Sequence, residues 1–373
     1  MRAELIYRGY LPGDESQILS LMRPYWKDIK DLCDWTHEFI DGPDGPCISR
    51  ICEIDGQIIG HMGLIMMQMT VFDKDVLAGK AEGLVVSEGY RKTSPRLAHL
   101  PSEDRCIFLR LSRNVWEEGL AHNVGIMWGF PNKMALGGHL RAGWESWALH
   151  CQTFIRPIST VGSARLLAKR VLRRNLSAPV AWISAAPLWL VTRHLRPLNR
   201  RQNNNVVPIR EFDERIDRFW HCLAERHQMI SINRTHRHLN WRFAHEPYVR
   251  VALIFDGQLK GYAVGLLRDK KELRELLIVD LVIDEGLFSS LDQVFGGLVE
   301  AVDSKVDCIT INCFSHGCAY GERLNIELKK FFIPVTRIHS IKSILKVNPL
   351  CCDDGRTKNS ANWFINDLFR ELF

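Results

Sequence analysis

Two side chains in the first half of the chain have the chemistry to move protons during a reaction, Glu82 and His139. Strand alternation places Glu82 on one face with Leu84 and Val86, and a carboxylate among apolar neighbours has a raised pKa, which suits a general base. The imidazole of His139 has an ordinary pKa near neutrality and could serve as a general acid. The alternatives are an ion pair between Glu82 and Lys80, and a polar histidine on a helix surface.

A cluster of cationic and hydroxyl side chains follows the run L-V-V-S-E-G-Y-R at residues 84–91, which has the pattern of a strand ending in a turn. The cluster consists of Arg91, Lys92, Thr93, Ser94 and Arg96. A helix is predicted over 102–119, and the unpaired amides at a helix start attract anions. We therefore expect a phosphate-binding turn. The alternative is a surface loop whose helix is capped by its own acids, Glu103 and Asp104.

A second strand and a short helix follow. The apolar run Val124–Trp128 predicts the strand, and Gly-Phe-Pro-Asn at 129–132 predicts the turn after it. Asn132 is the expected N-cap, because its side chain can accept hydrogen bonds from the first helical amides. The helix is expected to end at Gly143-Trp144.

In this order, the elements from Ala78 to Trp144 resemble the acyl-CoA-binding core of the GNAT acetyltransferases. The resemblance implies a mixed-sheet fold and acetyl-CoA as co-substrate, with no metal. It implies that Leu84, Val85 and Val86 bind the cofactor, and that the backbone amides of Val85 and Val86 polarise the thioester carbonyl. The pantetheine arm would insert between splayed strands beside Asn132.

The same resemblance assigns roles to the polar residues. The turn would hold the CoA pyrophosphate through Arg91, Lys92, Thr93, Ser94 and Arg96. Glu82 would be the base, and His139 would be the acid at a position where many members carry tyrosine. This chain departs from the family after Arg91, because the stretch 92–101 has no glycine.

Motifs of the first half return in the second half in the same order. The run R-I-C-E-I-D-G-Q-I-I-G at 50–60 is echoed by R-V-A-L-I-F-D-G-Q-L-K-G at 250–261. We therefore predict an internal duplication: an α+β chain of tandem GNAT-like domains at 1–157 and 206–373, joined by a helical connector at 158–205. Two unrelated α+β domains are the alternative. The acidic Asp284-Glu285-Gly286 turn predicts that only the first half binds a phosphate-bearing cofactor.

The connector carries the positive charge of the chain. Ten Lys or Arg and no Asp or Glu lie between Arg156 and Asn205, and subtracting these ten from the net charge of +6 leaves −4. A basic amphipathic pattern at 161–176 precedes an apolar, Trp-bearing stretch at 178–192. This pattern predicts a peripheral membrane contact through 161–201. A helical spacer packed between the halves is the alternative, and no nucleic-acid partner is expected.

Other features narrow the class of protein. The 11 cysteines follow no disulfide framework, and the start is strand-like, so we expect a cytoplasmic protein. A membrane contact through the connector would place it peripherally at the inner face of the membrane. Cys313, His316 and Cys318 lack a second zinc pair, so no metal site is expected. Hydrolase, NTPase and metalloprotease motifs are absent.

The expected activity is therefore N-acyl transfer from acetyl-CoA to an amine of a small molecule or amino sugar. A weaker resemblance to GNAT proteins of polysaccharide modification suggests the amino sugar. The alternatives are a Fem-type transferase that uses aminoacyl-tRNA and a tandem module without catalytic activity.

Overall fold

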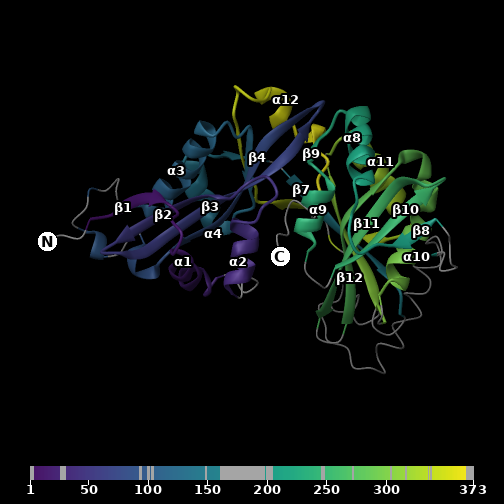
Figure 1. Ribbon diagram of the computed structural model, residues 1–373, viewed down its shortest axis with the longest axis horizontal. Helices are drawn as coiled ribbons and strands as arrows, with labels where there is room; N and C mark the ends of the chain where they lie inside the picture. Colours follow the sequence, from purple (N-terminus) through teal and green to yellow (C-terminus); the bar gives the residue numbers. More distant parts are fainter. Residues whose placement is uncertain are drawn as a thin grey trace.

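Two mixed sheets of eight strands each form the protein (Figure 1). The computed structural model describes residues 4–366 except 26–30, 92–94, 99–100, 102–104, 148, 160–197, 199–204, 245–247, 271–272, 303–304, 316, 335 and 337. The predicted connector, 158–205, lies almost wholly outside the described residues. The mixed α+β class predicted from the sequence is confirmed.

The first sheet has the order β1-β2-β3-β4-β5-β16-β6, and β9 also pairs with β3. Its strands are β1 (Ile6–Gly9), β2 (Ile48–Ile54), β3 (Gln57–Val71), β4 (Lys74–Val86), β5 (Ile126–Gly129), β16 (Ile344–Val347), β6 (Glu145–Ser146) and β9 (Ile230–Ile232). Its helices are α1 (Glu15–Met22), α2 (Leu32–Phe39), α3 (Ile107–Ala121) and α4 (Lys133–Arg141). Helices α1 and α2 join one apolar core and α3 joins another, so they cover opposite faces.

The second sheet has the order β14-β7-β13-β12-β11-β10-β8, and β15 also pairs with β7. Its strands are β14 (Ile333–Pro334), β7 (Leu149–Pro157), β13 (Cys308–Ser315), β12 (Leu273–Ile283), β11 (Gln258–Lys270), β10 (Tyr248–Phe255), β8 (Val206–Pro208) and β15 (His339–Ile341). The described helices of this half are α8 (Arg215–His227), α9 (His236–Arg242), α10 (Leu291–Glu300), α11 (Ala319–Leu328) and α12 (Asp354–Lys358).

The hairpins predicted at the two Asp-Gly pairs are confirmed. Asp55-Gly56 joins β2 to β3, and Asp256-Gly257 joins β10 to β11. All four residues have positive φ, at 49° and 76° in the first turn and 50° and 73° in the second. Such a pair forms the type I′ turn, whose twist matches that of the strands it joins.

Each sheet contains strands from the other half of the sequence: β7 lies in the second sheet, and β16 and the short β9 lie in the first. Strand β7 precedes the connector, yet it pairs with β13 along its whole length, from His150 opposite Ser315 to Pro157 opposite Cys308. Strand β16 belongs to the second half, yet it pairs with β5 of the first. The two sheets therefore exchange strands, and separating them would break both ladders.

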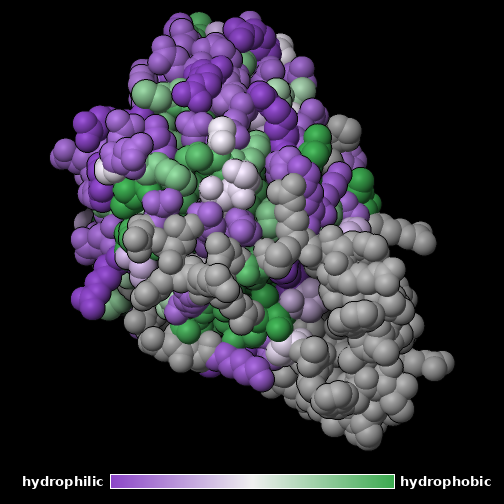
Figure 2. All heavy atoms as spheres, turned by 90° about the vertical axis from the view of Figure 1, so that its right-hand side faces the viewer, coloured by the Kyte–Doolittle hydropathy of each residue, from purple (hydrophilic) through white to green (hydrophobic). Residues whose placement is uncertain are grey.

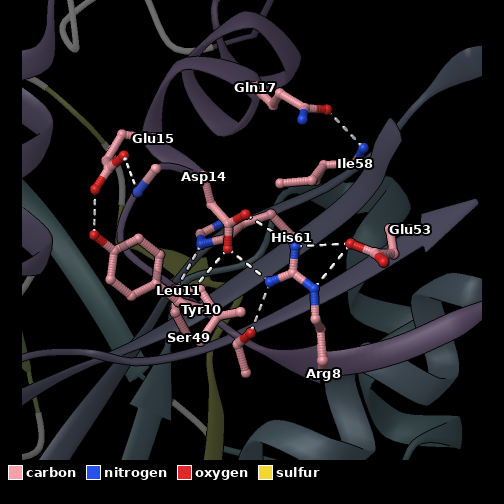
Figure 3. A network of polar contacts seen from close by, with 12 residues as sticks. Arg8, Tyr10, Leu11, Asp14, Glu15, Gln17, Ser49, Glu53, Ile58 and His61 are labelled. Atoms are coloured by element: carbon pink, nitrogen blue, oxygen red, sulfur yellow. Dashed lines mark hydrogen bonds and ion pairs between the residues drawn. The ribbon is translucent and has the colours of Figure 1, made fainter. Parts of the chain in front are cut away.

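A polar network attaches β1 and α1 to the first sheet (Figure 3). The Arg8 guanidinium donates to Glu53 on β2 at 2.8 Å and to Asp14 before α1 at 2.7 Å. Arg8 holds the pKa of the Asp14 carboxyl below its ordinary value, chiefly by this hydrogen bond. Gln17 of α1 closes the network by accepting from the Ile58 amide at 2.9 Å.

A buried ion pair lies at the centre of the second domain. Arg234 Nε lies 3.2 Å from Asp280 Oδ2, and both side chains are fully buried. Arg234 also donates to Ser231 Oγ at 2.7 Å, and the Tyr262 hydroxyl donates to Asp280 at 2.5 Å. These contacts compensate the desolvation of both charges.

We expect Arg234→Ala to lower the free energy of unfolding by about 3–5 kcal/mol, because Asp280 would stay buried without its cation. Urea unfolding measures the change. The matched control is Arg274→Ala, which removes an exposed partner of Asp269 and should cost at most about 1 kcal/mol. Equal effects of the two substitutions would contradict this account of the buried pair.

Candidate active site

A crevice opens where β4 and β5 diverge. The two strands pair in parallel from Ala78 opposite Ile126 only as far as Lys80 opposite Trp128. Strand β5 stays in the sheet because β16 pairs with its other edge, with Ile344 opposite Gly129. The divergence therefore leaves the second half of β4 with one edge facing a cavity.

A β-bulge in β4 produces this divergence. The pairing with β3 shifts between His61 and Gly63, and Gly83 at the bulge has a φ of +67°. The buried His61 fixes the bulge, since its Nδ1 donates to the Gly83 carbonyl at 2.9 Å while its Nε2 accepts from the Ser49 hydroxyl at 2.7 Å. Burial lowers the pKa of His61 to about 4. His61 is thus a core histidine.

The amides of β4 alternate between β3 and the crevice. The Ser87 amide donates to Ile59 of β3 at 2.8 Å. Because neighbouring amides in a strand point to opposite edges, the Val86 amide faces the crevice and the Val85 amide faces β3. Of these two valines, only Val86 can donate to a group lying in the crevice.

Helix α3 begins at the crevice. It starts at Ile107, later than the predicted 102, and its first turn holds no acid. Glu103 and Asp104, expected at the helix start, lie outside the described residues and before this start. The first turn of a helix has amides without intrahelical partners, so the helix start favours an anion. Cys106, Ile107 and Phe108 line the cavity there.

Two adjoining cavities make up the crevice. One of about 390 Å³ extends from the α3 start along Leu84, Val85 and Val86 to Asn132. The other, of about 320 Å³, contains Glu82, His139 and Ile344 of the exchanged strand. Both are lined by Tyr25, Leu84, Asn132 and Ala135, so the two cavities adjoin one another.

Of the expected phosphate-binding residues that the structure describes, one lines the crevice and one does not. Arg91 lines the larger cavity, and its Nη2 donates to the Tyr25 hydroxyl at 2.7 Å. Arg96 lies over the Tyr90 ring, with its guanidinium carbon 5.2 Å from the ring centroid, and lines neither cavity. Lys92, Thr93 and Ser94 lie outside the described residues. Tyr25, which the sequence did not single out, lines both cavities.

Asn132 is the N-cap of α4, as predicted. Its side-chain oxygen accepts from the amides of Met134 at 3.0 Å and Ala135 at 2.9 Å. The same residue lines both cavities, so the cap also forms part of the crevice wall.

Glu82 belongs to a group of charged residues beside the smaller cavity. Its carboxylate lies 2.9 Å from the buried Lys80 ammonium, so the ion pair considered from the sequence is present. Glu38 of α2, which the sequence analysis did not single out, lies close enough to Glu82 for the charge of Glu82 to affect its pKa. Burial, and next the charge of Glu82, raise the pKa of Glu38 to about 8. Near neutral pH Glu38 therefore holds its proton while Glu82 pairs with Lys80.

His139 is buried on α4 rather than exposed on a helix surface. Its Nδ1 lies 2.8 Å from the Ser112 hydroxyl, and its ring packs edge-on against Phe108 and Trp144. Burial lowers the pKa of His139 to about 4, so the imidazole is neutral at pH 7. The ordinary pKa assumed from the sequence does not apply in this environment.

The second sheet has the same divergence, but the chain itself fills it. Pairing of β12 with β13 ends at Ile278 opposite Ile311. Phe364 and Asn366 lie at this point, where the Phe364 amide donates to Ile230 at 2.9 Å and Asn366 bonds to Asp280. The remaining cavity is about 30 Å³. The filled crevice leaves no room for a cofactor between these two strands.

Across the described part of the chain, no group of three His, Cys, Asp or Glu side chains is arranged to hold a metal ion. His316 is not among the described residues. None of the described helices is long and apolar enough to cross a membrane.

Solved structures of similar fold identify the architecture. A conserved protein of unknown function from Enterococcus faecalis V583 has a TM-score of 0.61 at 10% identity, covering 92% of this chain and 72% of that one. A GCN5-related N-acetyltransferase from Anabaena variabilis ATCC 29413 has a TM-score of 0.58 at 10% identity, with coverages of 92% and 73%.

N-myristoyltransferase of Saccharomyces cerevisiae, solved with bound myristoyl-CoA and inhibitors, has a TM-score of 0.54 at 10% identity, with coverages of 97% and 86%. No protein-family model matches the chain, and no curated protein sequence matches it. At this identity the similarity shows the fold, which is that of the GCN5-related N-acetyltransferases.

The buried histidines predict acid sensitivity. The folded pKa of His139 lies below its ordinary value of 6.5, so the unfolded chain binds the proton more tightly and stability falls as pH drops from about 6.5 towards 4. Between pH 7 and pH 5 we expect a loss of about 2 kcal/mol from this residue.

Urea unfolding measures the free energy of unfolding of His139→Gln and of the parent protein at the two pH values. The loss of stability between pH 7 and pH 5 should be smaller in His139→Gln by about 2 kcal/mol. His122→Gln is the control, since His122 is exposed on the end of α3. A pH dependence unchanged in His139→Gln would show that His139 is not held neutral.

Proposed function

We propose that the first domain transfers an acyl group from acyl-CoA to an amine. The observation that carries the proposal is the pair of adjoining cavities, which extends from the start of α3, past the diverging edge of β4, to Glu82 and His139. A long thioester cofactor needs such a channel, with an anion site at one end and proton-transfer groups at the other.

The larger cavity suits the cofactor. The free amides of the first turn of α3 and the guanidinium of Arg91 favour the pyrophosphate. The pantetheine arm would follow the open edge of β4 beside Leu84, where the Val86 amide can donate to the thioester carbonyl. Lys92, Thr93 and Ser94 remain proposed contacts, and acetyl-CoA is the proposed donor.

The smaller cavity suits the reaction. The amine nitrogen attacks the thioester carbon, the C–N bond forms as the C–S bond breaks, and the amine gives a proton to Glu82. Because Glu38 keeps its proton near pH 7, the negative charge needed for this step resides on Glu82. The departing CoA thiolate would accept a hydrogen bond from the neutral His139, whose Nε2 carries the proton when Ser112 donates to Nδ1.

The acceptor is proposed to be a primary amine of a small molecule or an amino sugar. It would attack as the neutral amine, whose N–H can donate a hydrogen bond to Glu82, and the cavity of about 320 Å³ is within the usual range of ligand sites. The peripheral membrane contact through 161–201 also stays a proposal. Co-sedimentation of the chain with anionic vesicles, with and without 161–201, tests it, and equal partitioning would remove it.

We expect acetyl-CoA to bind the protein with a dissociation constant between about 1 μM and 1 mM, as is common for enzyme substrates. Isothermal titration calorimetry measures it. Arg91→Ala should weaken binding about tenfold, since a charged hydrogen bond to phosphate contributes roughly 1.5–3 kcal/mol.

The control for this substitution is Arg113→Ala on the exposed surface of α3. No heat of binding at millimolar acetyl-CoA would refute the proposed function. Binding that Arg91→Ala leaves intact would place the pyrophosphate elsewhere.

Glu82→Gln should lower kcat about 10²–10⁴-fold, because the substitution keeps the size of the side chain but removes the base. The measurement is release of free CoA thiol in the presence of a panel of primary amines. Glu117→Gln, at an exposed position of α3, is the control. A retained acetyl-CoA affinity would show that Glu82→Gln has not simply unfolded, and undiminished turnover would remove Glu82 from the mechanism.

A further inference from the structure

We propose that the second domain carries a separate binding site for a ligand with a diphosphate group. The site is a cavity of about 390 Å³ between α8 and the hairpin that joins β10 to β11. This volume is within the usual range for small-molecule sites. The cavity shares no lining residue with the crevice of the first domain.

Basic side chains dominate the cavity. Three arginines of α8 and one lysine of β11 line it, together with a single acid, Asp284. The four basic residues are Arg215, Arg218, Arg226 and Lys260. The arginines share one face of α8 and meet the lysine across the cavity, so positive charges from two elements converge on one space (Figure 1 shows α8 beside the second sheet).

These charges are only partly neutralised by the protein. Arg215 pairs with Asp213 at 2.7 Å, and Arg226 lies 3.6 Å from Asp284. Arg218 and Lys260 form no ion pair with any residue that the structure describes. Like charges that converge repel one another, and a bound polyanion would relieve the repulsion. Guanidinium groups can also bind phosphate oxygens in pairs.

Apolar side chains form the rest of the wall. Phe219 and Leu223 of α8 and Leu259 of the hairpin line the cavity beside the cations. A free inorganic ion would leave this apolar wall unused, whereas a diphosphate attached to an organic group would contact both. Figure 2 views the molecule from the side of the second domain and shows mainly hydrophilic residues over the upper part of that face.

The first domain offers an internal comparison. At the corresponding place, between α1 and the β2–β3 hairpin, Gln17 spans the gap by accepting from the Ile58 amide at 2.9 Å and donating to the Gly56 carbonyl at 3.4 Å (Figure 3). Helix α1 contains no basic residue. One copy of this helix–hairpin pair is thus bridged by a glutamine, while the other encloses a basic cavity.

The test uses inorganic pyrophosphate as the probe, titrated into the full chain with acetyl-CoA at saturation. The titration is repeated in an Arg91→Ala background, which lacks the proposed contact between the first domain and the cofactor phosphate. Pyrophosphate binding that persists in this background belongs to the second-domain site, so failure of this site can be told apart from failure of the proposed function. We expect binding that weakens at least tenfold in the double variant Arg218→Glu, Lys260→Glu. The matched control, Lys329→Glu, reverses an exposed charge at the end of α11 in the same domain and should bind like the parent.

Binding should also weaken when salt is raised from about 50 to 500 mM, because exposed charges are screened. The milder pair Arg218→Ala, Lys260→Ala keeps the test valid if charge reversal unfolds the protein. No pyrophosphate binding, or equal binding by all variants, would overturn the proposal. Vesicles of phosphatidylglycerol then distinguish the two sources of the phosphate group. If the vesicles retain the parent protein but not the double variant, the ligand is a lipid phosphate. If they retain both proteins equally, the ligand is a soluble diphosphate.

Discussion

The divergence of β4 from β5 is the constraint on which the rest of the first domain depends. A strand that leaves its neighbour gives up ladder hydrogen bonds, and β5 is only four residues long. Pairing with β16 on the other edge compensates for this loss. The bulge at Gly83, held by the buried His61, then directs the end of β4 away from β5. The crevice therefore depends on a strand supplied by the far end of the sequence.

The central parallel strands diverge in both domains, but only the first domain keeps the space between them open. In the second, pairing between the central parallel strands also stops early, and a bulge near Val279 accompanies it. There the chain places Trp363 and Phe364 against the diverging strands, with the Cys318 amide donating to the Trp363 carbonyl at 2.8 Å. Filling the space with its own residues turns a ligand site into apolar core, which stabilises the fold by burial.

The local sequence pattern predicted the strands and hairpins well, because a hairpin turn or an alternation of buried and exposed side chains is specified by a few neighbouring residues. The Asp55-Gly56 and Asp256-Gly257 turns are examples. The strand exchange could not be predicted, since β7 and β16 carry no local signal that specifies which of two similar sheets they join. Glu38 was missed although a signal exists: it lies three residues after Trp35, on the buried stripe of α2. A carboxyl on an apolar helix face is unusual enough to be noted.

Burial has opposite consequences for the pKa of Glu38 and for the pKa of His139 beside the crevice. It raises the pKa of Glu38, so one proton is retained and the charge near Lys80 is carried by Glu82. It lowers the pKa of His139, so that residue is neutral. A site containing one carboxylate and one neutral imidazole can accept a proton from an amine, yet it has no imidazolium to protonate the thiolate. Because a CoA thiolate is a stable leaving group near neutral pH, with an ordinary thiol pKa of about 8.5, hydrogen bonding is sufficient for its departure.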